Sequence, residues 1–371
     1  MRNKFGLGEW SGAFGDLGTL IPFVVGYIAV VGINPTGILV TFGIFSIITG
    51  IRFKTPMPVQ PMKAIAATSI AGAVTPNMIG VAGLFSGLFW LVIGLTGALK
   101  WVKKIVGKPL IRGITLGLGF SFMFQGLGFM QEGAIVAILA AILAFAMVNS
   151  KRIPTMLVLL AFGIIASSIT NPYFMQEIST ISIGFSLPTF ALGGLTWQEV
   201  ATGIFILAIP QIPLSLGNSI LSTTDQHNQL FPERPIAEKD GAISMGIANL
   251  TAPIIGGVPM CHGSGGLAAH TRFGGRTGGT MIIIGSILLL LGLFFGSSVL
   301  TIFYIIPVPV LGVILFMAGL ELAMSARDIG SDKQDFYIML ITAGFSLWNV
   351  GIGFVAGLIA QQVVKFRNTS G

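Results

Sequence analysis

The sequence predicts an all-α polytopic membrane protein, and its composition is the first reason. Of the 371 residues, 53% are hydrophobic and only 9% are charged, whereas a soluble domain carries about 25% charged residues. The single cysteine, Cys261, excludes an internal disulfide and a cysteine-based metal cluster. The net charge of +7 comes from short basic clusters between apolar runs. Such clusters are typical of membrane orientation signals rather than of nucleic-acid binding.

The second reason is a succession of apolar runs separated by polar or Pro/Gly-rich breaks. A bilayer-spanning helix needs about 20 mostly apolar residues, and the runs predict fourteen elements. Their expected ranges are 12–31, 36–51, 60–73, 78–98, 110–125, 133–149, 154–170, 199–221, 241–255, 261–271, 279–295, 299–324, 335–348 and 350–366. The third and tenth are short, because Pro56, Pro58 and Pro61 precede the one and the glycine-rich stretch 256–266 precedes the other.

The third reason is the distribution of basic residues, because cytoplasmic loops hold an excess of Lys and Arg. If the amino terminus is cytoplasmic and each element crosses once, 19 of the 20 basic residues lie on the cytoplasmic side and none in the opposite loops. This separation predicts a multi-pass protein of the cell (inner or plasma) membrane with both termini in the cytoplasm. Lys63 alone is left within the membrane.

The chain also shows traces of an inverted repeat of two seven-segment halves. Aligning Pro56-Met57 with Pro259-Met260 places the two short elements in corresponding positions. Each half is expected to open with a first helix interrupted by proline, Pro22 in one half and Pro210 and Pro213 in the other. The expected halves are residues 1–195 and 196–371. Paired broken segments in corresponding positions indicate a transporter's binding site.

Lys63 is the first candidate for that site. A charged group at bilayer depth costs a few kcal/mol or more and usually faces a cavity or a partner. The functional interpretation is that Lys63 attracts an anion. The alternative is that it extends to the cytoplasmic surface or pairs permanently with Asp16.

The starts of the two short helices favour the functional interpretation. The first turn of a helix leaves about four backbone N–H groups unpaired and carries about half a positive charge. Two such starts facing each other across the membrane would prefer an anion. The residues that fit this role are Gly263, Ser264, Gly265 and Gly266, because glycines let the backbone approach a ligand and the serine adds a hydroxyl donor.

Polar side chains near these helix starts extend the candidate site. Gln60 precedes Lys63 by one turn and offers an amide donor, unless it caps a helix or bonds a neighbouring one. Gln211 and Asn218 are seven positions apart and share one helix face. They are expected to line the same cavity, with a polar contact between helices as the alternative.

Titratable residues provide candidates for ion coupling. Asp16, in the first helix, could partner Lys63 or carry a proton. His262 could add charge for an anion or sense a proton gradient, and its alternative is a capping or packing role. Glu9 is expected to be solvated at the start of the first helix, and His227 and His270 are weaker candidates.

No sequence motif supports an enzyme or a cofactor. HExxH, GxSxG, Walker and Cys/His patterns do not occur. The sequence therefore predicts no catalytic residues, no metal site and no cofactor.

Four motifs resemble the prokaryotic and plant molybdate transporter family within the sulfate permease superfamily. They are Gly12-Ala-Phe-Gly-Asp-Leu-Gly-Thr-Leu-Ile-Pro22, Pro56-Met-Pro-Val-Gln-Pro-Met-Lys-Ala64, Pro210-Gln-Ile-Pro213 and Pro259-Met-Cys-His-Gly-Ser-Gly-Gly-Leu-Ala268. They are long and occur in the same order across nearly the whole chain, so the resemblance is specific.

The resemblance implies a fold of two intertwined seven-segment inverted repeats, like that of uracil and anion permeases, in which a core domain moves against a gate domain. It implies an oxyanion substrate, molybdate before sulfate, held by Gln60, Lys63 and the turn from His262 to Gly265. The fold also admits a homodimer. About five residues follow the last expected helix, so no carboxy-terminal regulatory domain is expected.

The leading hypothesis is therefore a secondary active oxyanion transporter, coupled to protons through His262 or Asp16. A sulfate or other anion exchanger or channel on the same fold is the first alternative. A nucleobase permease would call for an acidic residue facing the base, and none lies near Lys63 in sequence. A membrane enzyme is the most distant alternative.

Overall fold

The computed structural model describes residues 2–72, 74–101, 106–147, 155–189 and 192–370. Each of the fourteen expected ranges contains helix. Positions 73, 148, 149 and 154 of these ranges lie outside the described residues. The first half contains α1 (Leu7–Ala13), α2 (Leu17–Ala29), α3 (Pro35–Phe53), β1 (Gln60–Pro61), α4 (Lys63–Ala71), α5 (Pro76–Thr96), α7 (Lys108–Met130), η1 (Gln131–Gly133), α8 (Ala134–Met147), α9 (Thr155–Thr170) and α10 (Phe174–Ser179).

The remaining elements follow the long connection after α10. They are α11 (Trp197–Ala201), η2 (Thr202–Ala208), α12 (Ile209–Leu214), η3 (Ser215–Leu221), α13 (Ser222–Leu230), α14 (Glu238–Thr251), η4 (Ala252–Ile255), β2 (Met260–Cys261), α15 (Ser264–Arg272), α16 (Gly279–Phe295), η5 (Gly296–Ser298), α17 (Val299–Tyr304), α18 (Val308–Met324), η6 (Ser325–Asp328), α19 (Lys333–Trp348) and α20 (Val350–Ser370). The π-helical stretches η2 and η3 flank α12, which contains Pro210 and Pro213.

The expected break of the first helix at Pro22 is wrong. The chain leaves the helix between α1 and α2, at Phe14 to Asp16, and α2 continues through Pro22. Pro22 lies inside α2, so it removes one backbone hydrogen bond of the helix without ending it. The break lies instead beside Gly15, where a Cβ would crowd the Ala269 carbonyl at 2.7 Å. The interruption therefore coincides with a close backbone contact to α15.

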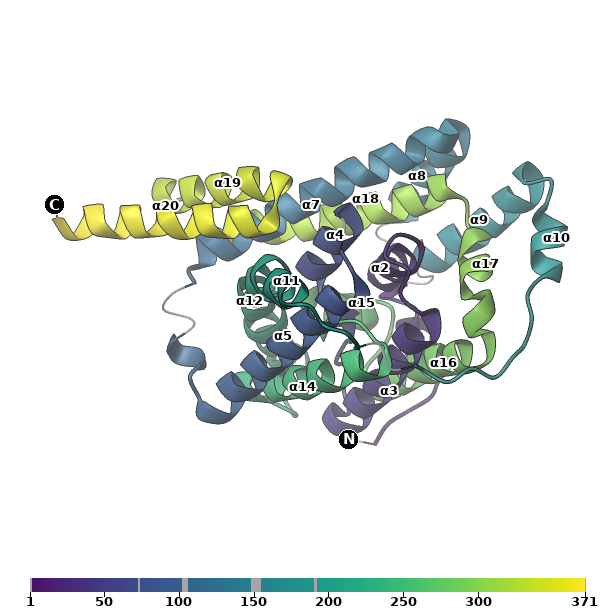
Figure 1. Ribbon diagram of the computed structural model, residues 1–371, viewed down its shortest axis with the longest axis horizontal. Coiled ribbons are helices and arrows are strands. Elements are labelled where there is room, and N and C mark those ends of the chain that lie inside the picture. Colours follow the sequence, from purple (N-terminus) through teal and green to yellow (C-terminus); the bar gives the residue numbers. More distant parts are fainter. Residues whose placement is uncertain (1, 73, 102–105, 148–154, 190–191, 371) are drawn as a thin grey trace.

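The helices form two groups. The first bundle contains α1 to α5 and α11 to α16, and the second bundle contains α7 to α9 and α18 to α20, which extends across the top of Figure 1. In the first bundle, α3 packs against α16 and α5 against α14; in the second, α7 packs against α18 and α19. Glycines face one another at these crossings, as at Gly43 with Gly285 and Gly126 with Gly312. Small residues let membrane helices approach closely, which accounts for much of the glycine content.

The two short helices meet at a small antiparallel ladder in the first bundle. Strands β1 and β2 pair Gln60 with Cys261 and Pro61 with Met260. The Met62 amide adds a bond to the Pro259 carbonyl at 2.9 Å. Helices α4 and α15, nine residues each, follow directly from these strands and lie near the centre of Figure 1.

The helices agree with a membrane protein by length and composition. Within the described residues, six helical stretches are long and apolar enough to cross a bilayer, and shorter apolar helices accompany them. The six are Leu7–Ala29, Pro35–Phe53, Pro76–Thr96, Lys108–Met147, Trp197–Leu230 and Gly279–Ile302. The architecture is that of a mostly helical, polytopic membrane protein.

Candidate functional site

Lys63 lies at the start of α4, as the sequence predicts. It is the first residue of the helix, after Met62 in an extended conformation. Its side chain is only 6% exposed, and Nζ lies 3.4 Å from Oε1 of Gln60. The cation is therefore buried at the point where β1 becomes helical.

Gln60 connects this cation to Asp16. Its Nε2 donates to Oδ1 of Asp16 at 2.8 Å and to Oδ2 at 2.7 Å, while its Oε1 accepts from Lys63. Asp16, at the break between α1 and α2, is 8% exposed. The amide thus separates the buried carboxylate from the buried ammonium, instead of leaving them in a direct ion pair.

The start of α15 presents free backbone donors. Gly263 is extended, and no side chain caps the helix. Within the part of the chain that the structure describes, the amides of Ser264 and Gly265 have no hydrogen-bond acceptor. Gly265 is exposed, and a Cβ built there meets no atom within 4 Å. The start of α15 thus offers two unpaired backbone donors, with free space beside Gly265, which is the kind of helix start that binds anions.

Asn218 and Ser264 form one wall of this opening. The Ser264 hydroxyl donates to Oδ1 of Asn218 at 2.8 Å, and both residues are half-buried. Gly263 connects this wall to Gln60, because a Cβ at Gly263 would overlap Oε1 of Gln60 and lie 3.0 Å from Nδ2 of Asn218. The site that contains Lys63 and the start of α15 are thus neighbours.

Gln211 has a different place from the one expected of a cavity-lining residue. Its Oε1 accepts from the amides of Ala64 at 2.8 Å and Ile65 at 3.4 Å, and its Nε2 donates to the Ser215 hydroxyl at 2.9 Å. Gln211 therefore caps α4 from α12. The Gln211 side chain satisfies two amides at the start of α4, whereas no side chain caps the start of α15.

His262 is fixed by the protein at both ring nitrogens. Nδ1 lies 2.7 Å from the Pro58 carbonyl and Nε2 lies 2.9 Å from the Ser244 hydroxyl. The ring is 3% exposed and lies edge-on to Phe53. This geometry matches the alternative packing role, in which His262 ties β2 to the segment before β1 and to α14.

Sequence reasoning missed one residue that anchors the helices, Asn249, and predicted the wrong environment for another, Glu9. Asn249 of α14 is fully buried and brackets Met260, accepting from its amide at 2.8 Å and donating to its carbonyl at 2.7 Å. The expectation that Glu9 is solvated is wrong, because it is 5% exposed and accepts from the Thr277 amide at 3.2 Å and from the Thr280 hydroxyl. A lone polar residue in an apolar run was the available signal for Asn249.

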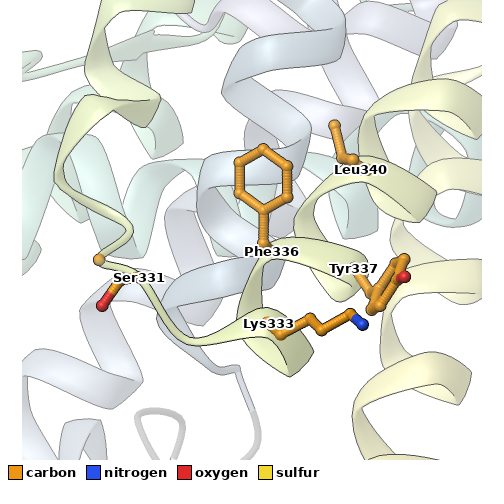
Figure 2. A pocket seen from close by; sticks show the side chains of 6 residues that line it. Ser331, Lys333, Phe336, Tyr337 and Leu340 are labelled. Atoms are coloured by element: carbon orange, nitrogen blue, oxygen red, sulfur yellow. The ribbon is translucent and has the colours of Figure 1, made fainter.

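A pocket that is separate from this site lies on the second bundle at the start of α19. It has a volume of about 400 Å³ and is lined by Gly330, Ser331, Lys333, Phe336, Tyr337 and Leu340. Figure 2 shows Lys333 beside the ring of Tyr337, with Nζ 5.8 Å from the ring centroid. None of the predicted site residues lines this pocket. Among the described residues, no cluster of three or more His, Cys, Asp or Glu side chains could hold a metal ion.

Comparison with known sequences places the chain among transporters. A family model described as "Molybdate transporter of MFS superfamily" matches residues 8–122 and 203–322. "Molybdate transporter 2" of Arabidopsis thaliana is 32% identical over 412 residues, which cover 97% of this chain and 87% of the relative. "Molybdate transporter 1" of the same plant is 30% identical over 412 residues, covering 98% of this chain and 89% of the relative.

Solved structures show the same fold. The transmembrane domain of the cyanobacterium bicarbonate transporter BicA matches with a TM-score of 0.68 and 17% identity, covering 96% of this chain and 98% of that domain. SLC26A9 matches with a TM-score of 0.70 and 14% identity, covering 97% of this chain and 65% of that protein. The matched family model and the sequence relatives show that the chain belongs to the molybdate transporter family, and that it is a multi-pass membrane transporter rather than an enzyme.

Proposed function

We propose that the protein is a secondary active transporter of a tetrahedral oxyanion and that molybdate is its preferred substrate. The observation that carries the proposal is that the amides of Ser264 and Gly265, which have no hydrogen-bond acceptor among the described residues, lie next to the group of Gln60 and buried Lys63. Backbone donors, a helix start and a cation together favour an anion. The names of the curated relatives support molybdate among the oxyanions.

Proton coupling is proposed through Asp16. A dianion that enters a cell with a negative interior works against about 2.3 kcal/mol per charge per 100 mV, so accumulation needs a driving ion. When Asp16 is ionised, it offsets the charge of Lys63 across the Gln60 amide. Protonation of Asp16 removes this offset, and the amide can then turn so that its oxygen accepts from the carboxyl group. Lys63 is then released to the anion, which couples proton and anion binding.

The packing pattern supports alternating access by a displacement of the first bundle, an elevator-type movement, against the second. The proposed repeats are residues 1–195 and 196–371, seven segments each. Exchanging corresponding segments of these repeats relates the α3–α16 contact to the α14–α5 contact, and the α8–α9 contact to the α19–α20 contact. The β1–β2 ladder is antiparallel, as a two-fold relation between the halves requires.

The cellular setting is proposed from the charge pattern. With 19 of 20 basic residues on one side, both termini are assigned to the cytoplasm and the protein to the plasma or inner membrane. A homodimer in the membrane is compatible with this arrangement. Sulfate, which is also a tetrahedral dianion, is the competing substrate, and exchange without a driving ion is the competing mode.

Uptake into proteoliposomes tests the coupled mechanism. We expect an inward proton gradient to accelerate molybdate uptake by the wild-type protein, because the proton loads Asp16. Asp16→Asn removes the titrating group while keeping the shape, so uptake by this variant should no longer respond to the gradient. Wild-type uptake that is unchanged when the gradient is collapsed would contradict proton coupling. Stronger competition by sulfate than by tungstate or unlabelled molybdate would contradict the substrate assignment.

A further inference from the structure

A small cavity joins Asp16 to a histidine that the proposed mechanism does not use. It is about 20 Å³ in volume, and its polar lining residues are Asp16, Ser46 and His270. The rest of the lining is apolar: Ala13, Leu17, Leu20, Val59, Met281, Ile284 and Leu288. A cavity needs about 10–15 Å³ of volume open to a water-sized sphere to hold one water molecule. The cavity therefore has room for a single water next to both titratable side chains.

The ring of His270 is oriented by the backbone. It is 3% exposed, and Nδ1 lies 2.8 Å from the carbonyl oxygen of Gly12. Since a carbonyl oxygen only accepts, Nδ1 carries a proton in the neutral ring, and Nε2 is the nitrogen that gains or loses one. Among the described residues, no hydrogen bond to Nε2 is formed. One ring nitrogen is thus fixed by the backbone, and the other has no hydrogen-bond partner among the described residues.

Among the charged groups around His270, Asp16 is the one that lines the same cavity. Asp16 alone shares the cavity lining with it, and the α3 and α16 walls there carry no charge. Glu9 of α1 accepts from the Arg276 and Thr277 amides, and the Arg276 side chain donates to the Thr271 carbonyl. Four other charged or titratable groups lie outside the cavity lining: Lys63 of α4, Asp225 and His227 of α13, and Arg272 of α15. Lys63 bonds Gln60, Asp225 bonds Gln229, and His227 bonds Thr55.

We propose that His270 exchanges the coupling proton with Asp16 through one water molecule in this cavity. The O–H bond of the Asp16 carboxyl breaks as the water accepts its proton, and an O–H bond of the water breaks as Nε2 of His270 takes that proton. The water is regenerated, Asp16 becomes a carboxylate, and His270 becomes an imidazolium that still donates from Nδ1 to Gly12. This inference rests on the proton coupling proposed above.

The position of His270 suits the inward release of a proton. It lies in the last turn of α15, the end that the charge pattern assigns to the cytoplasm. A cation in the last turn of a helix is stabilised by the helix dipole. His270 therefore accepts the proton on the cytoplasmic side of the anion site and makes Asp16 available to balance Lys63 again.

Two variants test the exchange by different routes. His270→Gln keeps an amide donor for the Gly12 carbonyl but cannot carry a proton, and Ser46→Val fills the cavity without changing either titratable group. Both are reconstituted and assayed for molybdate counterflow, which needs no net proton movement, and for uptake driven by an inward gradient of one pH unit. For one coupled proton, that gradient raises wild-type accumulation by about tenfold.

Both variants are expected to keep counterflow near the wild-type rate and to lose most of this stimulation. His227→Gln, a change at a fully buried histidine that bonds Thr55, serves as the matched control and should respond to the gradient like the wild type. Full stimulation in either His270→Gln or Ser46→Val would overturn the proposal. If His270→Gln does not fold, the response of Ser46→Val decides alone. A wild-type protein that ignores the gradient would instead refute the proton coupling itself, and with it this inference.

Discussion

At the residue scale, the charge balance of the site depends on a neutral side chain. Gln60 separates the Asp16 carboxylate from the Lys63 ammonium and bonds both. Its place in turn depends on the absence of a side chain at Gly263, where a Cβ would overlap its carboxamide oxygen. Gly263 is therefore needed for close approach rather than for an unusual backbone conformation, since its φ is −74°.

The variant Gly263→Ala tests this dependence. The added methyl group should displace the Gln60 amide, which breaks the bridge to Asp16 and Lys63. A hydrogen bond to a charged group contributes about 1.5–3 kcal/mol, so we expect molybdate affinity to fall by tenfold or more in equilibrium binding. Gly344→Ala, in α19 with no atom within 4 Å of the added Cβ, is the matched control. Equal affinity in the two variants would show that the position of Gln60 does not matter.

At the element scale, the two short helices differ in how their first turns are satisfied. Gln211 caps α4, while α15 keeps two amides free. The free start is held in position from β2, whose Met260 is bracketed by Asn249 of α14. Buried backbone groups without partners are costly, so α14 acts as the scaffold for the open helix start.

The variant Asn249→Ala removes that scaffold contact. It leaves a buried amide and a buried carbonyl of Met260 without their partner, and each such group costs about 1–3 kcal/mol. We expect a lower midpoint of thermal unfolding in detergent and weaker molybdate binding. Thr251→Ala is the control, because Thr251 lies on the same helix, is exposed and bonds only carbonyls of its own helix. An unfolding midpoint for Asn249→Ala as high as that of Thr251→Ala would contradict the scaffold role.

At the scale of the whole molecule, the helical ranges and the burial of Lys63 could be predicted because apolar length and charge placement act locally along the chain. The burial of Glu9 and the cap on α4 could not be predicted. A packing role for His262 was one of two interpretations, but the partners that fix its ring could not be named. Each depends on a partner far away in sequence, such as Thr277 for Glu9, Ala64 for Gln211 or Ser244 for His262. Polar residues in membrane spans look alike until such partners are known.

The break at Asp16 shows the same limit. Proline is a known helix breaker, so the interruption was predicted at Pro22. The contact of Gly15 with the Ala269 backbone is not visible in the sequence, although it joins segments that lie in different halves of the chain. The candidate site likewise takes Lys63 from one half and Ser264 from the other, so its central claim concerns how the halves combine.

A double-mutant cycle on purified protein tests that claim most directly. Lys63→Ala removes the cation, and Ser264→Pro removes one free amide at a first-turn position that proline tolerates, after a residue already extended. Ser264→Ala is the control that loses only the hydroxyl. Molybdate affinity should fall about tenfold or more in each of Lys63→Ala and Ser264→Pro, and their effects should depart from additivity by more than the ~0.5 kcal/mol seen for independent sites. Unaltered affinity in Lys63→Ala, or strictly additive losses, would contradict a single anion site shared by the two halves.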